Sequence, residues 1–153
     1  MVCSGCCPPK VEIFIWQVLR GRVMVGQVLR NFEIVLDPSL DYGLCHEGSE
    51  TIDHLFLHCS WSRNLWTSCM DWWGVTSCTN NSVKDWFQGW SGLCPKNRYR
   101  RAWDTLFSAI AWYIWESRNL LLFKGVLLLL SFFCYRPCLS SLLSGVFFVL
   151  LAS

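Results

Sequence analysis

The feature of this sequence that most restricts its fold is an unbroken helical pattern over residues 97–123. Most of its apolar residues recur at the spacing of one helical face, and neither Gly nor Pro interrupts the stretch before Gly125. Trp103, Ile110 and Ile114 form the expected buried stripe of this helix. A long amphipathic helix of this kind indicates a mostly α-helical domain.

Shorter helical patterns precede the long one. Residues 10–23 place apolar side chains at positions i, i+3, i+4, i+7 and i+8 before a plausible stop at Gly21. Further helices are expected over residues 25–32, from Ile52 to Trp73 with Gly74 as the stop, and over residues 83–90. No sustained alternation of period two is present, so the sequence predicts a small, mostly α-helical domain.

The last 29 residues of the chain differ in composition from the rest. Residues 125–153 carry a single charge, Arg136, and without them the hydrophobic content falls from 53% to about 49%, an ordinary value for a globular domain. Residues 8–124 are therefore expected to form the domain, and residues 125–153 a hydrophobic helical tail outside it. Each apolar run beside Arg136-Pro137 is shorter than the roughly 20 residues of a membrane span. Two interpretations stay open: a membrane anchor, or a segment unrelated to the domain.

The net charge and the cysteine content bear on two kinds of function, nucleic-acid binding and metal binding. A net charge of +2 is too small to indicate nucleic-acid binding by itself. No secretory signal pattern is visible, so the ten cysteines favour metal ligation or burial in a reducing compartment over disulfides. An intracellular, nuclear or membrane-associated location is expected. Most of the ten Trp residues are expected in the core, with base stacking the minority role.

The best chemical signal is a group of Cys and His residues. Cys45, His54 and Cys59 are thiol and imidazole ligands of the kind that zinc prefers, and His58 lies four residues after His54. A Cys-x-x-Cys pair ending at Cys45 would need a cysteine at position 42, but Tyr42 stands there. The alternative is that these cysteines are simply packed in the core.

A fourth ligand for this group is therefore an open question. His58, His46, Asp41 and a water molecule are the candidates in the sequence. A further Cys-x-x-Cys pair, Cys3 and Cys6, lies at the start of the chain, without a following helix that would activate it.

Three blocks, taken in order, carry a family resemblance. The runs PPKVEIFIWQVLRGRV, GLCHEGSETIDHLFLHCSWSRNLW and WYIWESRNLLLF resemble the zinc-binding domain that follows reverse transcriptase in plant LINE-type retroelements. The resemblance covers roughly residues 8–124, and ETIDHLFLHC followed by SRNLW is its most specific part. It implies a helical domain with a short zinc-knuckle-like loop.

The resemblance also implies a ligand set and a role. Cys45 corresponds to the second Cys of the family's pair, His54 to its His and Cys59 to its last Cys, whereas Tyr42 replaces the first Cys. Zinc is the implied cofactor, at a site weakened by that replacement. The role is that of a non-catalytic, degenerate accessory domain that associates with RNA or DNA. The sequence has no Tyr-x-Asp-Asp motif or carboxylate cluster for nucleotidyl transfer, and no small-molecule substrate is expected.

A basic segment beside an aromatic residue is the candidate nucleic-acid surface. Its residues are Lys96, Arg98, Tyr99, Arg100 and Arg101. Basic side chains neutralise phosphates and an aromatic ring stacks on a base. A solvated first turn of the long helix is the alternative interpretation, and it is the preferred one. A second, sparser basic region comprises Lys10, Arg20, Arg22 and Arg30.

Overall fold

A computed structural model describes residues 7–32, 44–45, 49–76 and 81–124 of the chain. The described residues form helices and no strand, which confirms the mostly α-helical prediction for that part. The elements in chain order are α1 (Pro9–Leu19), α2 (Gly26–Asn31), a π-helical turn η2 (His54–His58), α3 (Ser60–Trp73), α4 (Val83–Trp90), the 3₁₀ turns η3 (Ser91–Leu93) and η4 (Asn97–Tyr99), and α5 (Arg100–Lys124).

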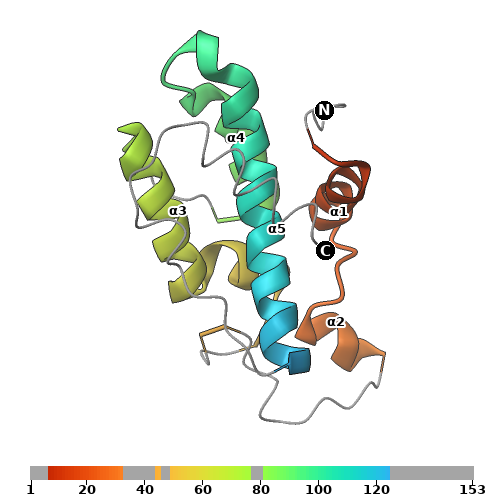
Figure 1. Ribbon diagram of the computed structural model, residues 1–153. Coiled ribbons are helices and arrows are strands. Elements are labelled where there is room, and N and C mark those ends of the chain that lie inside the picture. The colour runs from red at the N-terminus through yellow and green to blue at the C-terminus, as the bar shows by residue number, and fades with distance from the viewer. Residues whose placement is uncertain (1–6, 33–43, 46–48, 77–80, 125–153) are drawn as a thin grey trace.

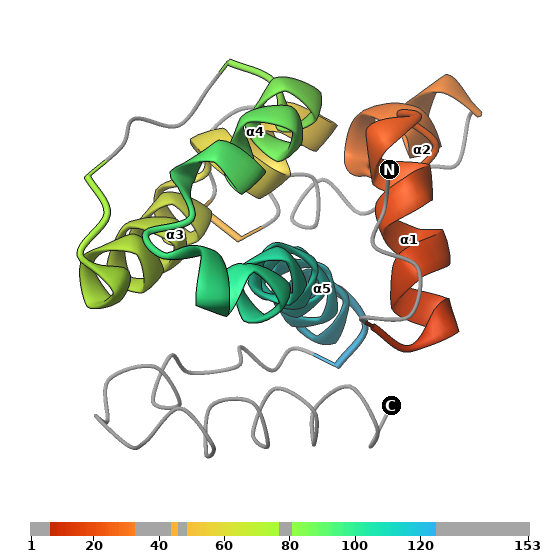
Figure 2. The same ribbon diagram turned by 90° about the horizontal axis from the view of Figure 1, so that it is seen from above.

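Helix α5 runs through the middle of the structure. Figure 1 shows α1 on one side of α5 and α3 on the other, and the view from above shows α4 facing α5 across the remaining side (Figure 2). Helices α1, α3 and α4 and the π turn all contact α5. The long helix identified in the sequence is thus the element around which the others pack.

Aromatic side chains fill the core around α5. Trp103 of α5 stacks on Trp90 of α4 with ring centroids 4.4 Å apart. The indole N–H of each of these two residues donates to the backbone carbonyl of the other, at 2.7 and 2.8 Å. Trp66 of α3 meets Trp86 and Trp90 edge to face. Four of the ten tryptophans are therefore buried core residues, as expected from their size.

The predicted first helix and the predicted stripe of α5 are confirmed. Pro9 stands in the first turn of α1, where a missing backbone N–H costs nothing. The side chains of α1 that face the core are Val11, Phe14, Ile15 and Val18. Trp103, Ile110 and Ile114 are buried in α5.

The helix expected from Ile52 to Trp73 is two elements instead of one. The backbone of Cys59, with φ −56° and ψ 130°, leaves the helical region between η2 and α3. The apolar pattern continues across Cys59, so periodicity alone gave no sign of the break. The expected stop is confirmed, since Gly74 ends α3 in the left-handed conformation.

A buried ion pair lies where the sequence shows a polar interruption in α5. Arg118 is only 2% exposed, and its Nη2 atom lies 2.7 Å from the Oε1 atom of Glu50. The Arg118 Nε–H contacts both oxygens of the same carboxylate at 3.2 Å. Glu50 Oε1 also accepts the backbone N–H of Gly26 at 2.8 Å. One carboxylate therefore joins α2, the segment before η2, and α5.

The hydrophobic tail at residues 125–153 lies outside the described residues, as do Cys3 and Cys6. The expected tail helix and membrane anchor fall there too. Within the described ranges, no helix combines the length and the apolar character needed to cross a membrane. The cysteines described are thiols rather than disulfides: Cys7, Cys45, Cys59, Cys69 and Cys94.

Candidate metal centre

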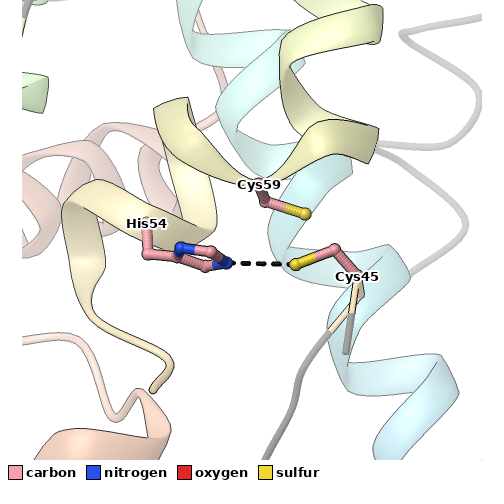
Figure 3. A group of neighbouring side chains, drawn as sticks. All are labelled: Cys45, His54 and Cys59. Atoms are coloured by element: carbon pink, nitrogen blue, oxygen red, sulfur yellow. Dashed lines mark hydrogen bonds between the residues drawn. The ribbon is translucent and has the colours of Figure 1, made fainter. Parts of the chain in front are cut away.

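Three of the predicted ligands lie together at the edge of the core. The Sγ atoms of Cys45 and Cys59 and a ring nitrogen of His54 all lie within 4.8 Å of one another. Cys45 Sγ and His54 Nε2 are 3.1 Å apart and form a hydrogen bond. Figure 3 shows the His54 imidazole directed at the Cys45 thiol, with the Cys59 thiol beside them. The cluster joins residues from two separate segments of the chain.

The π turn explains how His54 and Cys59 reach the same side of the backbone. Residues five apart on a regular α-helix point about 140° away from each other. Here the Cys59 N–H donates to the His54 carbonyl at 2.7 Å, the i to i+5 bond of a π-helix. This wider turn, followed by the extended backbone of Cys59, brings both side chains to Cys45. Thr51 starts the turn, because its Oγ1 accepts the His54 N–H at 3.0 Å.

Side chains from α3 satisfy the carbonyl groups of the π turn. Ser62 Oγ donates to the Leu55 carbonyl at 2.6 Å, and Trp66 Nε1 donates to the Phe56 carbonyl at 2.7 Å. Both donors are buried. Buried carbonyls without partners would destabilise the turn, so Ser62 and Trp66 hold the backbone on which His54 and Cys59 stand. Sequence reasoning missed this support, although the SRNLW block at residues 62–66, shortly after Cys59, was its signal.

Two cysteine thiols, one in α3 and one just before it, have pKa values well above the ordinary value. The pKa of Cys59 is raised to about 11, mainly by burial and in smaller part by hydrogen bonding and charge interaction with the Cys45 thiol. Burial alone raises the pKa of Cys69, in α3, to about 12. Cys59 is thus protonated at neutral pH when no metal is present. Because zinc binds the thiolate, zinc binding must displace this proton.

The donor set fits zinc in kind and in spacing. Two thiols and one imidazole are preferred zinc ligands, and ideal tetrahedral coordination places such atoms about 3.5–3.8 Å apart. The observed separations, from 3.1 Å between Cys45 and His54 up to 4.8 Å, need changes of only about 1 Å or less to reach that arrangement. Cys45, His54 and Cys59 would supply three of four ligands. Two of the candidates for the fourth ligand, Asp41 and His46, lie outside the described residues, as does Tyr42.

His58, the other candidate for the fourth ligand, is placed elsewhere. Its Nε2 atom lies 3.1 Å from the backbone oxygen of Asn81, at the start of the α4 segment. The cluster of possible metal ligands in the described part of the chain consists of Cys45, His54 and Cys59. The structure therefore groups three of the four candidates and gives His58 a different contact.

A pair of histidine substitutions tests this assignment. Replacing His54 with Ala should abolish or strongly weaken zinc binding, because one of three ligands is lost. Replacing His58 with Ala should leave the zinc affinity unchanged and cost at most about 1 kcal/mol of stability through its hydrogen bond to Asn81. Competition with a chromophoric chelator measures both affinities. An equal loss in the two variants would make His58 a ligand.

Zinc binding should also release protons and weaken as the pH falls. The raised pKa of Cys59 keeps its thiol protonated at neutral pH, so each zinc ion must displace about one proton from that group. Calorimetric titration in buffers of different ionisation enthalpy counts the protons released. Cys69→Ala is the matched control, since Cys69 is also buried with a raised pKa but lies outside the cluster. An affinity independent of pH would contradict thiolate ligation.

The predicted basic segment is exposed at the start of α5, but part of it is engaged in contacts. The Arg98 guanidinium lies 4.5 Å from the ring centroid of Tyr99. The Tyr99 ring in turn packs on Trp73, and Arg100 pairs with Asp104 at 3.4 Å. The four basic side chains, all exposed, are Lys96, Arg98, Arg100 and Arg101. The aromatic residue of the segment is thus half-buried rather than presented to solvent.

Comparison with families of known proteins finds a match in the first part of the chain. A family model described as zinc-binding in reverse transcriptase matches residues 1–66. No curated protein and no solved structure gives a significant match. The matched segment contains Cys45, His54 and Cys59, and it ends at Trp66, whose indole caps the π turn. It therefore includes the whole described cluster and the side chains that support it.

Proposed function

We propose, from the match of residues 1–66 to the family model for zinc binding in reverse transcriptase, that this chain is a zinc-binding accessory module without catalytic activity of its own. The proposal includes an origin in a LINE-type retroelement and an association with nucleic acid. The observation that carries it is the convergence of Cys45, His54 and Cys59 within 4.8 Å.

A bound zinc ion would act here as a structural cross-link. Cys45 belongs to a short segment that precedes the π turn, and His54 and Cys59 belong to the turn itself. Holding all three would fasten that segment to the core beside Leu44, which is buried. The binding free energy of a structural zinc ion is also folding free energy, so the ion would stabilise the whole domain.

The absence of catalysis is supported by how the buried carboxylate is used. Two-metal nucleotidyl transfer needs clustered carboxylates free to hold metal ions. Glu50, the buried acidic residue of the described part, is held by Arg118 and by the Gly26 N–H. The cluster of possible ligands contains two thiols and an imidazole and no carboxylate, which favours zinc over magnesium.

Zinc titration of the full chain tests the proposal. Tryptophan fluorescence and far-UV circular dichroism should change with one equivalent of zinc, and the melting temperature should rise with zinc concentration. Cys45→Ser and His54→Ala should remove the response, whereas Cys94→Ser, in a residue outside the cluster, should keep it. A response that persists in both ligand variants would show that the assigned site is wrong.

A further inference from the structure

Two arginine side chains lie against the ring of an exposed tryptophan on α1. The Trp16 side chain is 43% exposed. The guanidinium carbons of Arg20 and Arg22 lie 5.3 and 5.7 Å from its ring centroid. Neither arginine forms an ion pair with any acidic side chain in the described ranges. Two positive charges therefore gather on one solvent-facing indole ring.

The end of α1 builds this arrangement. Trp16 and Arg20 are four residues apart and so lie on the same face of the helix. Gly21 then turns the chain with a φ of +67°, and the Arg22 N–H donates to the Gln17 carbonyl at 2.9 Å. This turn returns Arg22 to the ring that Arg20 already contacts. The three side chains, called the Trp16 surface below, are thus positioned by a fixed helix end.

The chemistry of the Trp16 surface fits single-stranded nucleic acid. Guanidinium groups bind phosphate oxygens, and an exposed aromatic ring stacks on a base whose own face is free. Each nucleotide of an unpaired strand offers both a phosphate and a base with a free face. Duplex DNA offers the phosphates, but its bases are stacked on each other.

A membrane surface fits less well. A helix that lies on a membrane buries a broad apolar face among the lipids. The apolar face of α1 is already used, since Phe14, Ile15 and Val18 are buried in the core. Of the large apolar side chains on α1, only Ile13 and Trp16 remain exposed. These two side chains form only a small apolar surface, whereas the positive charges of Arg20 and Arg22 lie close together beside it.

We propose that Trp16, Arg20 and Arg22 bind single-stranded nucleic acid, with the indole stacked on a base and the guanidinium groups on adjacent phosphates. The inference rests on the nucleic-acid association in the proposed function and assigns it a surface. The basic segment at residues 96–101 is a poorer stacking platform, because Tyr99 already packs on Trp73.

Fluorescence anisotropy with the full chain and a short labelled oligothymidylate tests the Trp16 surface. Trp16→Ala should weaken binding about tenfold or more, because a stacked base is lost. The double variant Arg20→Gln, Arg22→Gln should weaken binding and lower the slope of log affinity against log salt by about 1.4. Trp72→Ala is the matched control, since Trp72 is 44% exposed and should not affect binding.

The outcomes separate this surface from the alternatives. Wild-type affinity in both Trp16-surface variants, or an equal loss in Trp72→Ala, would overturn the inference. Binding to phosphatidylserine vesicles with the same dependence on Trp16 would assign the surface to lipid and overturn it as well. Zinc titration of the same preparations distinguishes the two proposals. Zinc binding without oligonucleotide binding contradicts only this inference, and oligonucleotide binding through Trp16 without zinc binding contradicts only the zinc module.

Discussion

Replacing Glu50 with Gln is expected to destabilise the folded protein by about 3–5 kcal/mol. Both partners of the pair are buried, each with 3% of its side chain exposed. Removing the carboxylate charge leaves the Arg118 guanidinium in the core without an anion, and this uncompensated charge is the main cost. The Gly26 N–H keeps an oxygen acceptor in the Gln variant, so the loss reports mainly on the charge.

Urea denaturation followed by far-UV circular dichroism measures this loss. Arg100→Ala is the control, because it breaks a partly exposed pair with Asp104, four residues along α5, and should cost no more than about 0.5 kcal/mol. The double variant Glu50→Met, Arg118→Met should recover much of the stability, since no buried charge remains. A loss in Glu50→Gln no larger than in Arg100→Ala would mean that the pair is not buried in solution.

The same pair shows how the zinc-binding segment depends on the rest of the chain. Residues 1–66 contain Glu50 and the three ligands, but Arg118 stands on α5, outside that segment. Trp66, which caps the π turn, packs on Trp86 and Trp90 of α4. The ligands are therefore supported, through the turn, by helices that the family match does not include.

The sequence predicted the elements whose patterns are local. Val11, Phe14, Ile15 and Val18 of α1 follow helical spacing, and the structure buries them. The break at Cys59 could not be predicted in this way, because apolar residues continue on both sides of it. What breaks the helix is a set of contacts with α3, including the bond from Trp66 to the Phe56 carbonyl. Contacts of this kind depend on tertiary packing.

The candidate site shows the same division between local and distant information. Cys45, His54 and Cys59 were identified from ligand chemistry and family spacing, and the structure groups them. The burial of Arg118 was missed, because the partner that makes it possible stands 68 residues earlier. A lone Arg in a polar stretch of a helix is normally exposed. Only the fold places the Glu50 carboxylate beside it.

Replacing Tyr42 with Cys is expected to tighten zinc binding by on the order of 100-fold. The family spacing puts a cysteine at this position, three residues before Cys45. Structural zinc sites have four protein ligands, and their binding free energy of about 10–16 kcal/mol corresponds to roughly 3 kcal/mol for each. A fourth ligand, which here is a third thiolate, should therefore raise both the zinc affinity and the zinc-dependent gain in melting temperature.

Two comparisons make this last result specific to the metal centre. Tyr42→Ser removes the same ring without adding a strong zinc ligand, so it should leave the affinity near that of the natural chain. Tyr42→Cys combined with His54→Ala should bind less tightly than Tyr42→Cys alone, since the new thiolate acts together with the existing cluster. Competition with a chromophoric chelator measures each affinity. If Tyr42→Cys and Tyr42→Ser bind zinc equally, Cys45, His54 and Cys59 do not form three quarters of a tetrahedral site, and the metal assignment fails.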